Sequence, residues 1–547
     1  MNLQSWRMVL LGLILTSLIL HCVELDDIYP WADEGETLVL GEFTRNHGWP
    51  HLEGNDHLFC NQFGTTKEGL YIYHGWLQYY LVAFILFFFG KSIFFLRLPF
   101  ALAGVACVPL LWILAREIKL PRSIQVVSTT LLTFCVPFIL LNRNIRYYPL
   151  CSLFSLTTIL TYIWVIGRFP KRWPWFAISG IILLHTMPPV GGMVLLSTAI
   201  HALIFVRNKS VWKCLLYAGA IVTLFYLPYF FYIFPTIARS RSMVYAGHLT
   251  FVQRISNILV GFLLHLLYFI KLFFPTLLLI PYFIFLKKKK TLPEFNFSFV
   301  VLFLTMIALV CLMMSFVSTK NLFPGYTIEL LPFVFLFSGY IIVSASLQNK
   351  WFIISFTLIM IYSSFLCLPY WPFDKEKVEN RVSYIYADQN TRKKILKMSF
   401  YQNQLYFSLR SYFYEITHDY EGPVEGIVQY LKQHAKTGDT YFANNDMHTF
   451  YFLTGLKWVP KIPFENPPKW LIKRGGASWD RGVCFGEISE MGSAQTYINN
   501  YLKKYPYELI VLDYPDTAQE NMPVAPFHHR SATSRMKRRA FLLKAKE

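Results

Sequence analysis

Apolar stretches of about twenty residues recur along the first two thirds of the chain, from Met8 to Tyr370. A helix needs roughly 20 apolar residues to cross the hydrocarbon core of a bilayer. The pattern therefore predicts a polytopic α-helical membrane domain over residues 1–370. The stretches lie at 5–23, 76–90, 98–115, 123–141, 147–166, 174–187, 190–206, 211–234, 256–286, 297–317, 323–345 and 351–370.

Residues 371–547 have the mixed composition of a soluble domain and contain no spanning stretch. Apolar positions in Val424–His434 follow a helical period, whereas Asp439–Ala443 and Glu508–Asp513 are typical of short strands. We expect a small α/β domain over 371–547.

The net charge of +19 alone would suggest a nucleic-acid-binding protein, but the positions of the basic residues indicate otherwise. Many lie in short loops between apolar stretches, as in Lys287–Lys290, which is the pattern that orients membrane proteins. We therefore expect no nucleic-acid partner. The basic segment Arg530–Lys546 predicts either contact with anionic headgroups or a frayed, solvated tail.

The basic loops also decide how the short stretch 76–90 meets the membrane. If it spans fully, four basic clusters, at 116–122, 168–172, 207–213 and 287–290, fall on the external side. If it lies in the interface, all four become cytoplasmic, as the charge bias requires. We therefore expect an interfacial segment at 76–90.

This topology has about eleven spans and a cytoplasmic N-terminus. We expect the first stretch to be an uncleaved anchor, because no small-residue cleavage site follows it. The first external loop, 24–97, and the C-terminal domain then share the external side.

Within that loop, Glu24–His74 carries ten carboxylates and four histidines but only two basic residues. Such a segment can hold a general base or a cation at the membrane surface. Asp33, in Trp31–Glu36, is a candidate general base. The alternative is a structural helix N-cap.

Three cations are candidate phosphate ligands on the same predicted face. They are Arg143, Arg146 and Lys320. Arginine suits bidentate phosphate contact. Snorkelling toward headgroups is the alternative for the arginines.

Further polar groups fall at the external ends of spans. His185 is either functional or a hydrogen-bonded structural histidine, and Tyr326 lies in a loop with hydroxyls and a cation. A divalent metal held by the first-loop histidines with Asp33 or Glu34 stays open, although no zinc-helix spacing is present. Cys60 and Cys484 could pair across predicted external segments.

Five motifs follow one another in an order that resembles the membrane glycosyltransferases of the GT-C fold. The nearest families are the protein O-mannosyltransferases and the bacterial lipid A aminoarabinose transferase. The resemblance covers residues 1–210 well and 296–346 loosely. The motifs are Asp33-Glu34, Gly48-Trp49-Pro50, Tyr73–Leu77, Arg97–Gly104 and Arg143–Tyr147.

The resemblance implies a sugar donor carried on a polyprenyl phosphate and transfer with inversion on the external face. It implies catalytic roles for Asp33 and Glu34. His74 matches the histidine of a His-Pro-Pro-Leu stretch, and Arg146 matches an arginine of the second external loop. Tyr326, with Pro332, matches a later Arg-Tyr…Pro pattern.

The chain departs from the family pattern at three places. Gly75 and Trp76 replace the two prolines after the histidine, and Gly325 replaces the arginine before Tyr326. The Glu-Lys pair of the aminoarabinose enzymes is Tyr73-His74 here, which puts their metal site and their particular substrate in doubt.

The leading hypothesis is a polyprenyl-phosphate-dependent hexosyl- or pentosyltransferase that acts on a lipid, glycan or protein hydroxyl. The expected membrane is the bacterial inner membrane, with the C-terminal domain in the periplasm, capping the site or binding the acceptor. A transporter or flippase of a lipid-linked glycan is the alternative, because it would also need many spans and phosphate-binding arginines. A non-enzymatic assembly partner is a third.

Overall fold

The computed structural model describes most of the chain. The described residues are 3–51, 69–72, 74–167, 169–245, 251–288, 295–317, 324–346, 349–362, 409, 412–413, 416–419, 422–459, 464, 466–474, 494–516, 521 and 539–546. Lys320, both Cys60 and Cys484, and the predicted domain boundary near residue 370 lie outside them.

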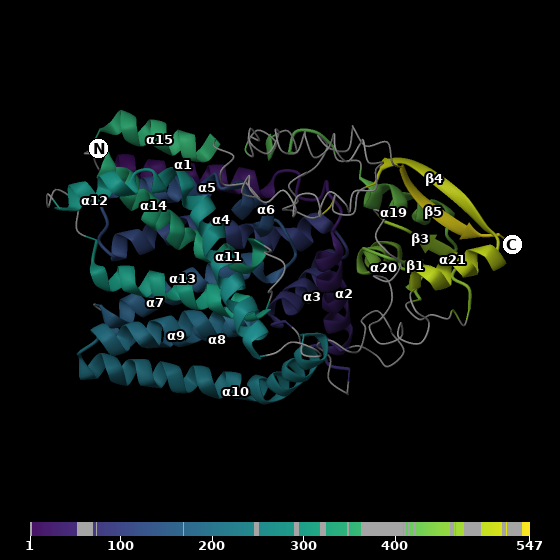
Figure 1. Cartoon of the computed structure of the whole chain (residues 1–547), viewed down its shortest axis with the longest axis horizontal. Helices are drawn as coiled ribbons and strands as arrows, with labels where there is room; N and C mark the ends of the chain where they lie inside the picture. The colour runs from purple at the N-terminus through teal and green to yellow at the C-terminus, as the bar shows by residue number, and fades with distance from the viewer. Residues whose placement is uncertain are drawn as a thin grey trace.

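The N-terminal part is a bundle of helices that run roughly along its long axis (Figure 1). Its elements are α1 (Leu3–Cys22), α4 (Ile93–Glu117), α5 (Arg122–Thr133), α6 (Val136–Asn142), α7 (Tyr147–Ile166), η1 (Pro170–Arg172), α8 (Trp173–Thr186), α9 (Pro188–Phe205), α10 (Lys209–Tyr245), α11 (Phe251–Leu277), α12 (Ile280–Lys288), α13 (Phe297–Val317), η2 (Pro324–Leu330), α14 (Leu331–Ala345) and α15 (Lys350–Tyr362).

Among the described residues, seven helices are long and apolar enough to cross a membrane. An eighth span results if α5 and α6 count as one, bent by 58°. Pro137 lies in the first turn of α6, where a proline is tolerated but the preceding helix cannot continue through it. The chain is thus a multi-pass membrane protein, and the count of eleven spans stays a prediction.

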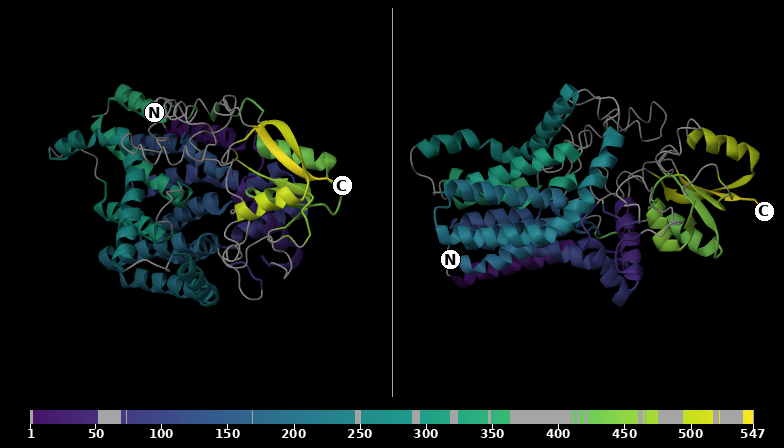
Figure 2. Two further views of the ribbon diagram at one scale, coloured as in Figure 1. Left: turned by 45° about the vertical axis from the view of Figure 1, so that its right-hand side comes forward. Right: turned by 90° about the horizontal axis from the view of Figure 1, so that it is seen from below.

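The first loop folds into two helices, α2 (Ala32–His47) and α3 (Leu77–Phe89). They lie across one end of the bundle (Figures 1 and 2). The 13 residues of α3 cover only about 20 Å at 1.5 Å per residue, too short for a bilayer core. Gly41 allows the two helices to approach closely, because a Cβ there would lie 2.2 Å from Val82 Cγ1. The interfacial prediction for 76–90 agrees with this arrangement.

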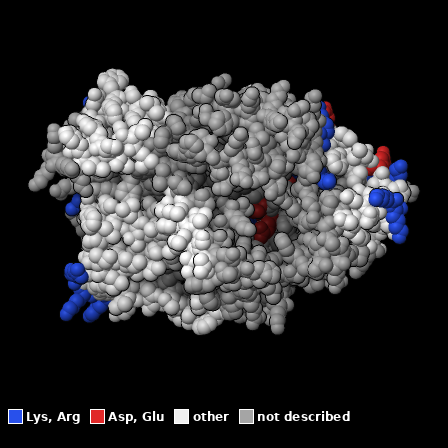
Figure 3. Space-filling model, in the orientation of Figure 1, with Lys and Arg blue, Asp and Glu red and all other residues white. Residues whose placement is uncertain are grey.

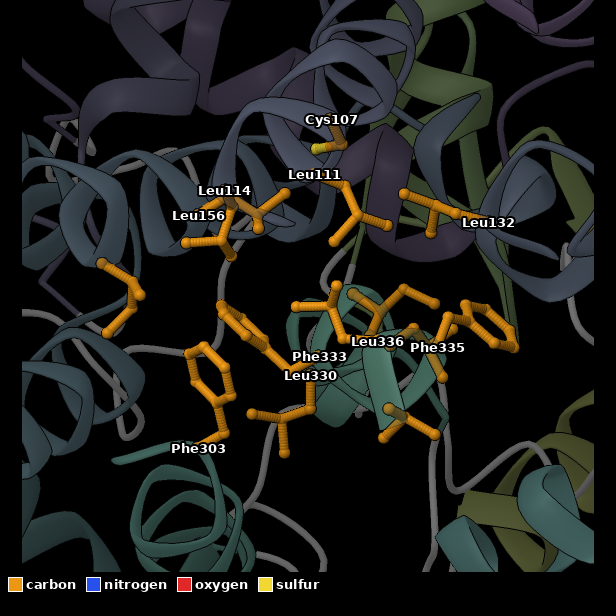
Figure 4. Packing of buried hydrophobic residues seen from close by; sticks show 14 of the residues in the cluster. Cys107, Leu111, Leu114, Leu132, Leu156, Phe303, Leu330, Phe333, Phe335 and Leu336 are labelled. Carbon is orange, nitrogen blue, oxygen red and sulfur yellow. The ribbon is translucent and has the colours of Figure 1, made fainter. Parts of the chain in front are cut away.

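The bundle core is apolar and continuous. Figure 4 shows Leu111 of α4, Leu156 of α7 and Phe303 of α13 directed toward Phe333 and other side chains of α14. All four are fully buried. Because helices in lipid gain little from burying apolar surface against one another, close packing of this kind holds the bundle together.

The C-terminal part is a small α/β domain at the end of the molecule that carries α2 (Figure 1). Its elements are α19 (Pro423–His434), β1 (Thr440–Ala443), α20 (Met447–Thr454), β2 (Lys457–Trp458), β3 (Trp470–Ile472), α21 (Ala494–Lys504), β4 (Tyr507–Pro515) and β5 (Arg539–Ala545). The strand order is β2-β1-β3-β5-β4, with β1 parallel to both neighbours and β5 antiparallel to β3 and β4. The helix and both strands predicted here are confirmed.

The expectation of a frayed tail is wrong for Arg539–Ala545, whereas contact with lipid headgroups stays a prediction. This segment is strand β5, paired on both edges. Ala540 and Leu542 are fully buried, whereas Arg539 is exposed. The run of four apolar residues from Ala540 to Leu543, not the net basic charge, was the informative signal.

Candidate active site

Arg146 lies at the centre of the candidate site, in extended backbone just before α7. Its side chain is only 4% exposed. Nη1 donates to the Asp33 carbonyl oxygen and to Thr37 Oγ1, each at 3.0 Å. Nη2 lies 3.1 Å from His74 Nε2. One guanidinium thus joins α2, α7 and the segment before α3.

Two carboxylates of α2 face this guanidinium. Glu36 Oε2 is 3.2 Å from Arg146 Nη1, and Asp33 Oδ2 is 3.7 Å from Nη2. The two acids are three residues apart, so they share one face of the helix. Tyr71 donates its hydroxyl to Glu36 Oε1. We call Asp33, Glu36, His74 and Arg146 the Asp33 cluster.

The Asp33 carboxylate is the accessible member of the cluster. Its side chain is 37% exposed, compared with 17% for Glu36. Figure 3 shows acidic atoms at the bottom of a hollow where α2 lies in Figure 1. A substrate can therefore reach this carboxylate.

Burial and charge separate the pKa values of these groups. Burial raises the pKa of Asp33 to about 6, because it outweighs the attraction of Arg146. Burial also disfavours the charged form of Glu36, but Arg146 and His74 outweigh it and hold that pKa at about 2. Burial, reinforced by Arg146, lowers the pKa of His74 to about 3. At neutral pH, Glu36 is a weak base, Asp33 a stronger one, and His74 is uncharged.

The neutral state of His74 fixes its tautomer. Arg146 can only donate, so His74 Nε2 accepts and the ring proton is on Nδ1. The imidazole packs 5.1 Å from the Tyr147 ring, between ring centres.

Glu34 faces away from the cluster, into the protein. Its carboxylate is fully buried and receives two hydrogen bonds from Arg97, at 2.9 and 2.8 Å. The Ile145 backbone N–H donates to it at 2.9 Å. Because Ile145 directly precedes Arg146, Glu34 connects the first turn of α2 to the backbone that carries Arg146.

The replacement of the first family proline by Gly75 has a steric reason. A Cβ at this position would lie 2.1 Å from the His185 carbonyl oxygen and 2.5 Å from that of Thr186. The segment after His74 therefore lies directly against the end of α8. His185 is half-buried there, with its ring 5.7 Å from that of Tyr229. Tyr229 donates to the His74 carbonyl oxygen at 3.2 Å, so the two predicted histidines belong to one neighbourhood.

The structure does not bring Arg143 into the Asp33 cluster. Its guanidinium donates to carbonyl oxygens at the end of α1 and just beyond, including Val23 and Glu24, both at 2.6 Å. It also donates to the Tyr412 hydroxyl at 3.1 Å. Arg143 thereby satisfies helix-end acceptors. Tyr326 lies within η2, which contacts α7.

The C-terminal domain packs directly on the helix that carries Asp33. Thr449 of α20 donates to the Trp31 carbonyl oxygen at 3.3 Å. A Cβ on Gly35 would lie 2.4 Å from Thr449 Oγ1, so only glycine permits this approach. Glu425 accepts from the Tyr29 backbone N–H at 2.6 Å. The domain therefore holds the chain on both sides of Asp33.

Sequence reasoning missed three contributors to the site. Glu36 could have been found, since it falls three residues after Asp33 on a predicted helix. Arg97 belongs to the motif Arg97–Gly104, but no nearby residue indicated that Glu34 is its partner. Tyr71 carried no signal, because its contact with Glu36 depends on how the loop folds back.

The alternative of a metal centre is not supported within the described ranges. They contain no group of three or more His, Cys, Asp or Glu side chains placed to hold a metal ion. In the Asp33 cluster, the cation beside the carboxylates is the Arg146 guanidinium.

Similar solved structures cover almost the whole chain. The crystal structure of ArnT from Cupriavidus metallidurans bound to undecaprenyl phosphate superposes with a TM-score of 0.54 at 13% identity, over 99% of this chain and 98% of that one. The apo form gives 0.50 at 11% identity over the same shares. No family model and no curated protein matches the sequence. The chain therefore has the fold of ArnT, and the predicted architecture of a polytopic helical membrane domain followed by a C-terminal α/β domain is confirmed.

Proposed function

We propose that this protein is a membrane glycosyltransferase that moves a sugar from a polyprenyl-phosphate donor to a hydroxyl group. Its fold is that of a protein crystallised with undecaprenyl phosphate. The acceptor is a lipid, a glycan or a protein, and the sugar is a hexose or a pentose. The proposed setting is the bacterial inner membrane, with the cluster and the C-terminal domain on the periplasmic side.

The observation that carries the proposal is the Asp33 carboxylate. Its side chain is 37% exposed, so a substrate can reach it, while desolvation by the surrounding protein still raises its pKa to about 6. A general base works best when its pKa lies near the working pH. Glu36, with a pKa of about 2, is too weak a base for this role.

In the proposed reaction, Asp33 takes the proton of the acceptor hydroxyl while its oxygen attacks the anomeric carbon of the donor. The bond from that carbon to the phosphate oxygen breaks on the opposite face. Polyprenyl phosphate leaves with the electron pair, so the sugar configuration inverts. No nucleotide takes part in this step.

Glu34 acts as a positioning residue in this scheme. Its carboxylate is fully buried, and its oxygens accept from Arg97 and the Ile145 N–H. It therefore fixes the positions of Asp33 and Arg146 and does not contact the substrate.

The leaving phosphate needs more positive charge than Arg146 supplies. Arg146 Nε is buried and has no hydrogen-bond partner among the described residues, so a phosphate oxygen could satisfy it. Its single charge is already offset by Glu36 and, once ionised, by Asp33. We assign the additional charge to Lys320. Arg143 supports the end of α1, and His74, His185 and Tyr326 line the donor sugar.

The test follows release of free polyprenyl phosphate by the purified full-length protein. A panel of polyprenyl-phosphate sugars is supplied with lipid and protein acceptors. Asp33→Asn should lower the rate at least a hundredfold, within the usual range for a general base. Asp26→Asn, which changes an exposed acid of the same loop, should be unaffected.

Equal rates in Asp33→Asn and the wild type would remove Asp33 from the mechanism. No release with any donor, together with movement of a lipid-linked glycan across proteoliposome membranes, would establish the transporter alternative instead.

A further inference from the structure

A large cavity lies at the end of the bundle away from the Asp33 cluster. Its volume is about 1910 Å³. It is lined by the C-terminal ends of α4, α7 and α9 and by residues at the start of α13 and late in α14. No member of the Asp33 cluster is among its lining residues. The cavity is therefore separate from the proposed site of sugar transfer.

The floor of the cavity is a fixed polar network around His201, which is 1% exposed. Its Nδ1 lies 2.7 Å from the Tyr162 hydroxyl, and its Nε2 lies 2.6 Å from Ser298 Oγ. The network joins α7, α9 and α13. Since both ring nitrogens are satisfied, it holds the three helices in register and the cavity is preformed.

The walls are aromatic and partly exposed, with the Arg172 guanidinium 4.2 Å from the Phe169 ring centre and 5.0 Å from that of Trp164. Phe169 and Phe297 are 42% and 71% exposed, and Trp164 and Phe205 line the cavity more deeply. Exposed aromatic surface beside a membrane domain is typical of contact with acyl chains. Such walls suit hydrocarbon better than a small soluble anion.

The rim is positively charged. Arg116, Lys119 and Arg207 all line the cavity and are exposed to solvent. Among the described lining residues, Glu117 is the one carboxylate, and it pairs with Arg116 at 3.2 Å. Figure 3 shows Lys and Arg at this end of the molecule. The rim therefore keeps a net positive charge where headgroups would lie.

Lys119 has a backbone that lysine rarely adopts. Its φ is +62°, at the position after α4 where glycine or asparagine is usual. Lys119 thus carries its charge at the rim despite an unfavourable local conformation. This gives a substitution, Lys119→Gly, that removes the charge and relieves the strain together.

We propose that this cavity binds one anionic membrane phospholipid, with its phosphate on Arg116, Lys119 and Arg207 and its acyl chains along the aromatic walls. The site lies at the membrane face opposite Asp33, so its occupant is neither donor nor acceptor. Charge complementarity selects an anionic headgroup, and the aromatic walls select a lipid over free phosphate.

The first test counts bound lipids by native mass spectrometry of the delipidated full-length protein. Phosphatidylglycerol is compared with phosphatidylcholine of identical chains and with inorganic phosphate. We expect one tightly retained phosphatidylglycerol. Its apparent affinity should fall at least about tenfold in Arg116→Gln/Lys119→Gln/Arg207→Gln. Lys209→Gln/Lys213→Gln/Lys350→Gln removes equal charge from exposed positions that do not line the cavity and should bind like the wild type.

A second measurement keeps the rim intact. Phosphatidylglycerol with brominated chains should quench the fluorescence of Trp164, whereas brominated phosphatidylcholine should not. This extra quenching by phosphatidylglycerol should be absent in Trp164→Phe. Trp175, 60% exposed on α8 and outside the cavity, is the control, and both lipids should quench it equally. Lys119→Gly should raise the lipid-free thermal midpoint but shrink the rise caused by phosphatidylglycerol.

Three results would overturn the proposal. They are equal retention of both lipids, an equal loss of affinity in the two triple variants, and saturation of the site by inorganic phosphate alone. Loss of sugar transfer in Asp33→Asn with unchanged lipid retention would show that the two sites are independent.

Discussion

Replacing Arg97 with methionine should destabilise the protein strongly. Arg97 makes two hydrogen bonds to Glu34 and two to the carbonyl oxygens of Leu25 and Ile28, at 2.8 and 2.6 Å. Without it, a fully buried carboxylate keeps only backbone donors, among them the Ile145 N–H. Removing one partner of a buried ion pair costs about 3–5 kcal/mol. We expect a loss of this size in the free energy of unfolding.

A double-mutant cycle separates the buried charge from lost packing. Glu34→Gln/Arg97→Met removes both charges, so about 2 kcal/mol of the loss should be recovered relative to Arg97→Met alone. The assay is unfolding in mixed micelles by SDS, followed by tryptophan fluorescence. Arg45→Met is the control, since this α2 arginine is 35% exposed and 3.9 Å from Glu42, and it should cost less than about 1 kcal/mol.

The reasoning would be refuted by Arg97→Met lying within about 1 kcal/mol of the wild type. Strict additivity of the two single substitutions would refute it as well, because it would mean that Glu34 and Arg97 do not interact energetically.

Three further outcomes are expected. Because Asp33 must be ionised to act, and burial raises its pKa to about 6, the transfer rate should fall about tenfold for each pH unit below 5; a pH-independent rate would exclude Asp33 as the base. Gly75→Ala should cost about 1–3 kcal/mol of stability and lower activity, because its Cβ would lie 2.1 Å from the His185 carbonyl oxygen. Gly192→Ala, with no atom within 4 Å of the added Cβ, should be neutral or stabilising in the same unfolding assay. Burial raises the pKa of Glu425 to about 7. The free energy of unfolding should therefore be highest below about pH 4.5 and should fall by about 3 kcal/mol as the pH rises through 7. Thermal midpoints measured across this range should fall with pH in the wild type and stay flatter in Glu425→Gln.

Much of the fold could be predicted from the sequence because it depends on local properties. Apolar length placed nearly every membrane helix, and loop charge predicted that 76–90 lies at the interface. The strand Arg539–Ala545 was missed because net charge was weighted above its apolar run, Ala540–Leu543. The break between α5 and α6 was also missed, although Pro137 marked it.

The candidate site could be predicted only in part. The order of the motifs predicted Asp33, His74 and Arg146 as site residues, and the structure places them together. It grouped Glu34 with them as well, although that carboxylate faces Arg97. Adjacent residues on a helix point about 100° apart, so one of two neighbours in sequence can face solvent while the other faces the protein interior.

The sequence by itself determined which segments are apolar enough to cross a membrane, and it predicted which acids and cations share one side of it. Apolar length and loop charge act through the bilayer and need no tertiary contact. Only the tertiary structure decided which carboxylate is open and which is buried. It placed Arg146 between Asp33, Glu36 and His74, and it separated their pKa values by burial and distance. Electrostatic interaction depends on spatial separation and solvent access, and neither can be read from spacing along the chain.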